Sequence, residues 1–173
     1  VFNGGLGENP LSTPDFLLDS ISSNINLKDY TSIEGKEILR KELFNYYPSF
    51  MNNIIVGNGL KELIFTLIFN WERKIFIPTP CWVTYLEDLK ILKKDFECIE
   101  CSYDNNYKLD SKLFEESLIK NNGSNSLLIL NNPTNPTGSV YSENELHNLV
   151  KIFRKYNITV FSDEIYFNTS QIN

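Results

Sequence analysis

Short apolar runs alternate with longer amphipathic stretches along most of this chain, and this alternation limits its fold more than any other feature. Runs of this length are typical of strands buried on both faces, and the stretches between them have helical spacing. Buried strands that alternate with helices indicate a mainly parallel sheet with helices on both sides. We therefore expect an α/β fold, a three-layer α-β-α sandwich. The predicted strands are residues 53–59, 74–80, 96–101, 126–130 and 158–161.

The amphipathic stretches carry the start signals of helices. The clearest is residues 142–156, where Ser142 and Glu145 form a capping-box pattern ahead of an apolar stripe. The stripe consists of Leu146, Leu149, Val150 and Phe153. The other predicted helices are residues 12–25, 35–47, 60–71, 82–94 and 109–120.

Single residues set several of the predicted helix boundaries. Thr13 is the expected N-cap of the first helix, with Pro14 at its first position, where the missing N–H costs nothing. Pro48 is expected to end the second helix, because proline cannot continue one. Asp110 or Ser111 is expected to cap the helix over residues 109–120.

Net charge and apolar patterning argue against two classes of partner. The net charge is −6, and no cluster of Lys and Arg suggests a face that would bind nucleic acid. No apolar run approaches the roughly 18–20 residues that a membrane span requires. We therefore expect no nucleic-acid partner and no membrane segment.

The three cysteines and the single histidine do not form a metal-site pattern. Cys98 and Cys101 are three apart at the end of a predicted strand, so they point to opposite faces. With only His147 to add, a zinc site lacks ligands. We expect the cysteines, Cys81 included, to be small packing residues in a reducing compartment, the cytoplasm.

Unusual residues follow several predicted strands, and the carboxyl ends of parallel strands are where such sheets bind ligands. Gly57 and Gly59 precede a predicted helix, whose free amides and dipole would favour an anion. A tight strand-to-helix turn explains the same two glycines. The segment contains neither of the glycine patterns typical of nucleotide-binding loops.

Asp163 follows a strand that we expect to be central and buried. A buried carboxylate is costly unless it is paired, so Asp163 requires a cationic partner there. The alternative is that it caps the next turn or accepts from a local amide. Trp82 and Tyr166, each taken alone, are compatible with ordinary packing.

Taken together, these segments resemble one family. "NNPTNPTG" (131–138), followed about thirty residues later by "SDEIY" (162–166), is similar to the class I/II aminotransferases, which are pyridoxal-phosphate enzymes of fold type I. The supporting matches occur in the family's order and cover nearly the whole chain. They are "GENPLSTPDF", "DYTSIEGKEILRKEL", "VGNGLKELIF" and "IPTPCWVTY".

The resemblance implies roles around the cofactor ring. Asp163 would pair with the protonated pyridine nitrogen, which is the cation that a buried carboxylate requires. Asn135 and Tyr166 would donate to the phenolic oxygen of the cofactor, and Trp82 would stack on the face of the ring.

The resemblance also implies how the cofactor phosphate and the substrate are held. The amides of Leu60 and Lys61, after Gly59, would bind the phosphate. Many relatives have a small or hydroxylated residue where Leu60 stands, so its side chain would add no contact. Tyr30 would reach the phosphate of a partner subunit, which implies a homodimer, and Gly7 would lie near the substrate.

The Schiff-base lysine of the family lies downstream of the segment that contains Tyr166, and none of the seven residues after Tyr166 is lysine. Lys61, Lys151 and Lys155 are not assigned to that role. We therefore expect an incomplete chain that is inactive alone. Residues 1–28 would form an arm near a small domain, and residues 29–173 would form part of the large domain.

The expected activity is transfer of an amino group from an amino acid to a 2-oxo acid. One alternative is a pyridoxal-phosphate-dependent lyase that acts on amino acids, since the same core serves both reactions. Another is a non-catalytic module that keeps the cofactor surface for binding or dimerisation.

Overall fold

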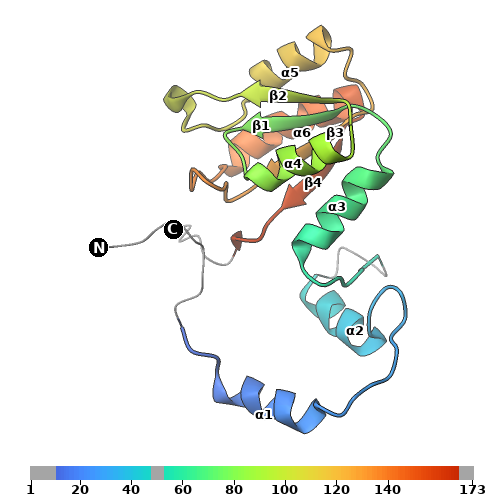
Figure 1. Cartoon of the computed structure of the whole chain (residues 1–173). Helices are drawn as coiled ribbons and strands as arrows, with labels where there is room; N and C mark the ends of the chain where they lie inside the picture. The colour runs from blue at the N-terminus through green and yellow to red at the C-terminus, as the bar shows by residue number, and fades with distance from the viewer. Residues whose placement is uncertain (1–10, 48–52, 168–173) are drawn as a thin grey trace. The chain divides into compact units, whose positions relative to one another are not determined.

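The computed structural model describes residues 11–47 and 53–167, which belong to two compact units, Val1–Gly57 and Asn58–Asn173. Figure 1 shows the course of the chain through both. Within the described residues, the first unit contains two α-helices, and the second contains the sheet and four α-helices. None of the helices within the described ranges is long and apolar enough to cross a membrane.

The helices of the first unit are α1 (Asp15–Asn24) and α2 (Glu37–Tyr46), and neither has a buried residue in the described structure. The prediction of Thr13 as N-cap was wrong by one residue. Pro14 occupies the N-cap, and its carbonyl accepts from the Leu17 amide at 3.0 Å. The predicted stop at Pro48 lies outside the described residues.

The prediction of a strand over residues 53–59 was wrong. Residues 53–57 form no strand in the described structure, and Ile55 is 64% exposed. The Val56 amide donates to the Glu34 carbonyl at 3.0 Å, but a strand requires a ladder of such bonds to a neighbour. The prediction rested on the apolar character of this segment. Apolar character alone does not show whether a neighbouring strand is present to pair with it.

The second unit is built on a parallel sheet of four strands in the order β2-β1-β3-β4. The strands are β1 (Ile75–Thr79), β2 (Phe96–Glu100), β3 (Leu127–Asn131) and β4 (Thr159–Asp163). The helices are α3 (Leu60–Asn70), α4 (Val83–Ile91), α5 (Ser111–Lys120) and α6 (Glu143–Tyr156), with a short 3-10 turn, η2 (Tyr103–Asn105). This arrangement confirms the predicted α/β fold.

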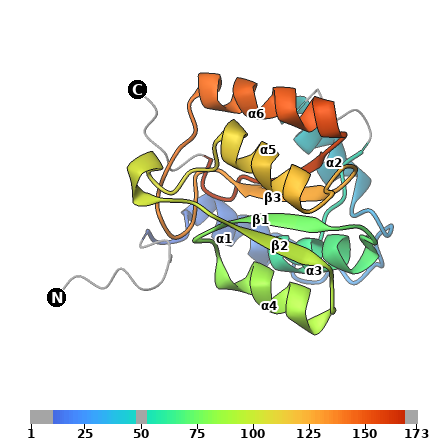
Figure 2. The ribbon, with the colours of Figure 1, turned by 90° about the horizontal axis from the view of Figure 1, so that it is seen from above.

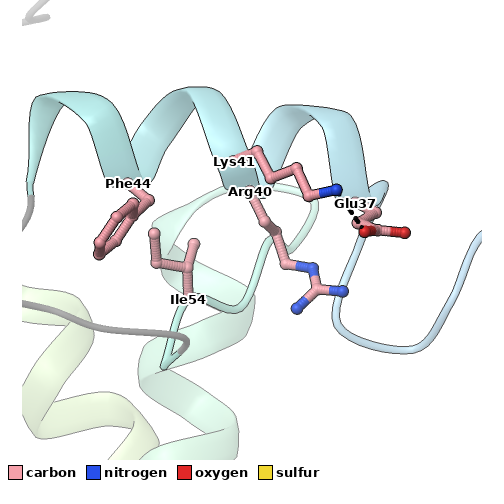
Figure 3. A pocket seen from close by; sticks show the side chains of 5 residues that line it. All are labelled: Glu37, Arg40, Lys41, Phe44 and Ile54. Atoms are coloured by element: carbon pink, nitrogen blue, oxygen red, sulfur yellow. Dashed lines mark ion pairs between the residues drawn. The ribbon is translucent and has the colours of Figure 1, made fainter.

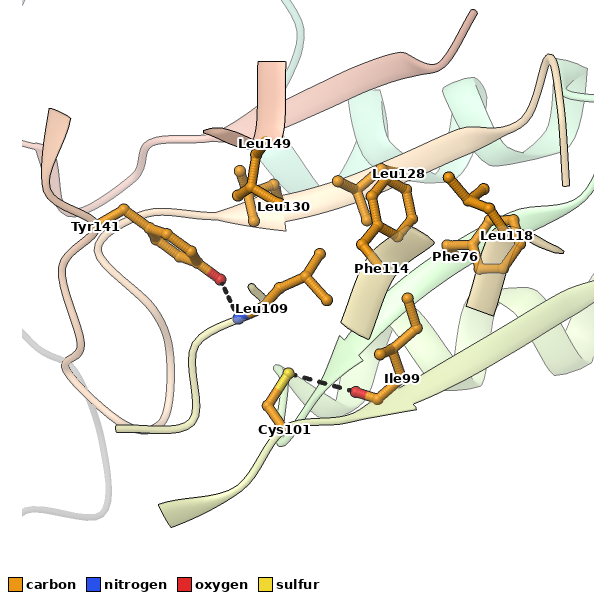
Figure 4. Packing of buried hydrophobic residues seen from close by; sticks show 10 residues of the cluster. All are labelled: Phe76, Ile99, Cys101, Leu109, Phe114, Leu118, Leu128, Leu130, Tyr141 and Leu149. Atoms are coloured by element: carbon orange, nitrogen blue, oxygen red, sulfur yellow. Dashed lines mark hydrogen bonds between the residues drawn. The ribbon is translucent and has the colours of Figure 1, made fainter. Parts of the chain in front are cut away.

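Alternate residues of the central strands enter two separate cores. On β3, Leu127 and Ile129 pack with α3 and α4, whereas Leu128 and Leu130 pack with α5 and α6. Figure 2 shows α4 on one side of the sheet and α5 and α6 on the other. Figure 4 shows the second core, in which Phe114 of α5 packs edge-on against Phe76 of β1 with ring centroids 5.8 Å apart. The three layers are therefore confirmed.

The strand that carries Asp163 is not central in the described sheet. β4 pairs only with β3 among the described strands, and Thr159 and Ser162 are exposed. Asp163 is nevertheless only 2% exposed, because the segments that follow β1 and β3 cover it at the end of the strand. The predicted burial of Asp163 is confirmed, but the predicted central position of its strand was wrong.

Both predicted helix caps of the second unit are present. The Asp110 carboxylate accepts from the Leu113 amide at 2.8 Å, so Asp110 caps α5. The Ser142 hydroxyl accepts from the Glu145 amide, and the Glu145 carboxylate accepts from the Ser142 amide at 2.7 Å. This capping box fixes the start of α6, directly after the segment that contains Asn135.

Candidate functional site

The carboxyl ends of three neighbouring strands bring four of the predicted site residues together. Trp82 follows β1, Asn135 follows β3, and Asp163 and Tyr166 lie at and after the end of β4. In a parallel sheet these ends meet at one edge. Contacts among these segments, described next, show that they form one connected group.

Asp163 accepts hydrogen bonds on both carboxylate oxygens. The Tyr85 hydroxyl donates to Oδ2 in a short bond, and the Ile165 amide donates to Oδ1 at 3.1 Å. The bond from Ile165 is the local turn contact that the sequence had left open as an alternative. Among the described residues, no lysine or arginine forms an ion pair with Asp163. The cation that a buried carboxylate requires is therefore not supplied by the described part of the chain.

Tyr85 is a site residue that the sequence did not single out. It is 1% exposed, and burial followed by its hydrogen bond to Asp163 raises the pKa of Tyr85 far above the ordinary value. The phenol is therefore neutral across the physiological range, and its O–H group donates a hydrogen bond to Asp163. The one available signal was its position three residues after Trp82, which is the N-cap of α4.

Asn131 ties the segment "NNPTNPTG" to β4. Its Nδ2 donates to the Asp163 carbonyl at 2.9 Å, and its Oδ1 accepts from the Asn135 amide at 2.6 Å. The Asn135 side chain in turn lies 3.5 Å from the Tyr166 hydroxyl. Two side-chain donors from different strand ends therefore converge on one place. Asn131 was within the motif that the sequence had marked, but this anchoring role was not predicted.

The turn itself is held by internal bonds and by a second layer of contacts. The Gly138 amide donates to the Thr134 carbonyl at 2.7 Å, and Gly138 has a φ of 70°, which favours glycine. The hydroxyl of Ser139, the next residue, donates to the Asn106 carbonyl at 2.5 Å. The end of the segment is therefore held to the loop that follows η2.

A cavity of about 20 Å³ lies next to Asn135 and Tyr85. That volume suits one water molecule and no aromatic ring. The lining residues include Cys81, Tyr85, Asn131, Thr134 and Asn135.

The start of α3 has the backbone features of an anion site. Gly59 is the N-cap with a φ of 105°, and it has no side chain to cap the helix. The Glu62 carboxylate accepts from the Asn58 amide at 2.7 Å, so an acidic side chain already binds one amide at this helix start. A Cβ at Gly59 would meet nothing within 4 Å. The Leu60 side chain packs toward the core, whereas Lys61 is exposed.

Two of the predicted site residues lie neither in the group around Asp163 nor at the start of α3. Gly7 lies outside the described residues. Tyr30 lies in the first unit, where it is fully exposed beside a shallow hollow of about 430 Å³. A second hollow of about 200 Å³, shown in Figure 3, is lined by residues of α2 and by Ile54, with Lys41 paired to Glu37 at 2.6 Å. It contains none of the predicted site residues.

The cysteines do not share one environment. Cys101 is buried in the core and Cys81 is partly buried, and burial raises the pKa of each thiol to about 11. Cys98 is exposed on β2, so the packing role predicted for it was wrong. Within the described residues, His, Cys, Asp and Glu form no group of three that would hold a metal ion.

Comparison of the sequence with known proteins identifies one family. A family model described as "Aminotransferase class I and II" matches residues 6–171. A probable aspartate/prephenate aminotransferase from Rickettsia felis is 32% identical over 174 residues, which cover 94% of this chain and 42% of that protein. An aspartate aminotransferase from Bacillus sp. (strain YM-2) is also 32% identical, over 96% of this chain and 44% of that protein.

Solved structures agree in fold. The crystal structure of an aspartate aminotransferase from Thermotoga maritima superposes with a TM-score of 0.81 at 23% identity, over 94% of this chain and 45% of that one. The chain thus spans less than half the length of the relatives it matches. Since the family model extends over almost the entire sequence, the chain belongs to the class I and II aminotransferase family.

Proposed function

We propose that this chain provides the cofactor-binding part of a pyridoxal-phosphate-dependent aminotransferase, which transfers an amino group from an amino acid to a 2-oxo acid. One observation carries the proposal. Asp163 is 2% exposed, accepts only neutral donors among its described contacts, and lies among the ends of three strands. Membership of the family supports the same reading.

The donor set fits a protonated pyridine ring. A buried carboxylate with two neutral donors keeps an uncompensated charge, and a pyridinium N–H would supply both a positive charge and a hydrogen bond. When bound, pyridoxal phosphate supplies an electron sink for a carbanion at the substrate α-carbon. The role of Asp163 is to hold the proton on the ring nitrogen, because its own charge favours the protonated form.

The other residues of the group would bind and orient the same ring. Asn135 and Tyr166 would donate to an oxygen beside the ring, at the place where their side chains already meet. Trp82 would cover the ring face, which also excludes water from it. The amides of Leu60 and Lys61, at the N-terminus of α3, would bind the phosphate.

We also propose that the intact enzyme is a homodimer with shared sites. In that arrangement Tyr30 would reach the phosphate bound by the partner subunit, and Gly7 would lie near the substrate. The full exposure of Tyr30 supports a contact outside its own unit. Residues 1–28 would then form an arm near a small domain, and residues 29–173 would belong to the large domain.

No lysine of the printed sequence is assigned to covalent attachment of the cofactor, and we propose that the 173-residue chain alone is inactive. Lys155 and Lys151 lie on α6, on the opposite side of the sheet from α4. The Lys155 ammonium lies 2.6 Å from Glu115, and Lys151 donates to Asn148. Lys61 lies beside the proposed phosphate site, where its amide has a different role.

Replacement of Asp163 tests this function. Asp163→Asn keeps the shape of the side chain and removes its charge, so we expect pyridoxal phosphate to bind at least about tenfold more weakly. Equilibrium dialysis of the 173-residue chain measures the affinity, and circular dichroism checks the fold. Asp95→Asn is the matched control, because it removes the charge of an exposed aspartate. Equal affinity in Asp163→Asn and the parent chain would contradict the proposal. For the intact enzyme, aspartate and a 2-oxo acid are the first substrates to assay, given the names of the relatives.

A further inference from the structure

Tyr85 joins two groups of the candidate site. Its ring lies edge-on to Trp82, with centroids 5.5 Å apart and an interplanar angle of 89°. Its hydroxyl reaches across from α4 to the carboxylate of Asp163 at the end of β4. Both partners of this bond are almost fully buried, Tyr85 at 1% and Asp163 at 2% exposure. A buried bond of this kind has little competition from water.

The bond restricts the carboxylate more than any other described contact. The Ile165 amide holds Oδ1 from within the same turn, but a single bond leaves the carboxylate able to rotate about its axis. The Tyr85 hydroxyl fixes the other oxygen from a separate helix. Each carboxylate oxygen has two acceptor sites, so both retain capacity for one more donor. Tyr85 therefore sets the direction in which the free acceptor sites of the carboxylate point.

Packing alone does not require the hydroxyl. A phenylalanine ring would fill the same space between Trp82 and the core, which is otherwise built from apolar side chains. The hydroxyl has a described function only through Asp163. Because the phenol is neutral, it orients the carboxylate without cancelling its charge.

We propose that Tyr85 is a positioning residue, which acts through Asp163 to aim the carboxylate at the ring nitrogen of the cofactor. This proposal rests on the proposed function, because it assumes that Asp163 meets that nitrogen. Tyr85 itself would not touch the reacting atoms. Its effect should therefore depend on whether the ligand has a ring nitrogen at all.

The experiment compares two ligands of the 173-residue chain. One is pyridoxal phosphate, and the other is its carbocyclic deaza analogue, in which C–H replaces the ring nitrogen. The parent chain is expected to prefer pyridoxal phosphate. Tyr85→Phe should reduce that preference about tenfold, mainly by weakening binding of pyridoxal phosphate and not of the analogue. Equilibrium dialysis at constant pH gives both affinities.

The matched control is Tyr156→Phe. Tyr156 also donates from its hydroxyl to a carboxylate, that of Glu115 at 3.0 Å, but it lies on α6. We expect this variant to keep the preference of the parent chain. A double variant, Tyr85→Phe with Asp163→Asn, should lose no more preference than Asp163→Asn alone, because Tyr85 acts through Asp163.

The outcomes separate the two proposals. If the parent chain binds both ligands equally, Asp163 does not meet a ring nitrogen, and the proposed function fails. If the parent prefers pyridoxal phosphate and Tyr85→Phe keeps that preference, or loses affinity for both ligands equally, only the role of Tyr85 is wrong. A selective loss in Tyr85→Phe supports it.

Folding failure is also informative. If Tyr85→Phe does not fold, Tyr85→Met replaces the ring with a flexible apolar chain for the same comparison. An unfolded variant should regain its fold when Asp163→Asn is added. The neutral amide costs less to bury than a carboxylate whose oxygen has lost its hydrogen-bond donor. If neither Tyr85 variant folds and Asp163→Asn restores neither, Tyr85 is a packing residue and the inference is overturned.

Discussion

Two aspartates are buried in the second unit, and only one of them has partners on both oxygens. Asp163 accepts from Tyr85 and Ile165. Asp88 on α4 is 5% exposed, and its Oδ2 has no hydrogen-bond partner in the described structure. A buried unpaired oxygen is costly, so Asp88 lowers the stability of the native state in its charged form.

The pKa of Asp88 gives this cost a pH dependence. Burial raises the pKa above the reference value of 3.8, and the charge of Lys61 opposes the rise only in part. The folded state therefore binds a proton more readily than the unfolded state. The cost of Asp88 is present at neutral pH and disappears as the pH falls through the folded pKa toward the unfolded value.

Asp88→Leu is therefore expected to stabilise the chain. The free energy of unfolding should rise by about 1–2 kcal/mol at pH 7, since an apolar side chain replaces an unpaired carboxylate. The gain should shrink as the pH is lowered, because the parent carboxyl takes up its proton as the pH falls through the folded pKa. Urea denaturation at pH 7 and at a series of lower pH values measures both effects. Asp95→Leu, at an exposed position, should show no comparable gain. A loss of stability in Asp88→Leu at pH 7 would show that Asp88 has a partner.

At the scale of elements, the start of α6 is joined to the segment that precedes α5. The Glu145 carboxylate closes the capping box with one oxygen and pairs with Lys108 through the other. Burial of Glu145 alone would raise its pKa, but the bonds from Lys108 and Ser142 outweigh burial and lower it. Glu145 therefore stabilises the fold above its unfolded pKa, and this contribution is lost as the pH falls through the folded pKa.

Ser142→Ala removes half of the capping box. We expect a loss of about 0.5–2 kcal/mol in the free energy of unfolding, because the Glu145 amide loses its acceptor. Ser142→Thr keeps a hydroxyl at the cap and serves as the control, with a much smaller loss. Urea denaturation at pH 7 compares them. Were the alanine and threonine variants equally stable, the cap would contribute nothing to α6.

At the scale of the whole molecule, no described lysine forms an ion pair with Asp163, and Lys61 lies beside the proposed phosphate site. Hydrogen bonding to Glu115 raises the pKa of Lys155, which lowers the fraction of free amine available to an aldehyde. No described lysine is buried beside the proposed ring position. We therefore expect that none of the described lysines attaches the cofactor covalently.

Borohydride reduction of the 173-residue chain with pyridoxal phosphate tests that expectation. We predict weak labelling spread over several surface lysines, as expected for exposed amines with no activating neighbour. Peptide mass spectrometry locates and quantifies the adducts. A single lysine labelled close to one per chain, at Lys61 above all, would show that this chain does hold the covalent residue.

Much of the fold follows from local pattern. The capping residues Asp110 and Ser142, the helical stripe of α6 and four of the five predicted strands are local signals, and each was found as expected. The segment 53–59 was not a strand, because a strand depends on a neighbour that its own residues do not specify. The edge position of β4 was missed for the same reason.

The sequence by itself determined which residue types stand at the strand ends, and through its motifs it marked Trp82, Asn135, Asp163 and Tyr166. Spacing along the chain cannot show what Asp163 touches, because its partner Tyr85 is 78 residues away. Only the tertiary structure decided that a neutral hydroxyl from α4 orients this carboxylate, and that Asn131 holds Asn135 beside β4. Those contacts exist because the parallel order of the strands brings their carboxyl ends to one edge of the sheet.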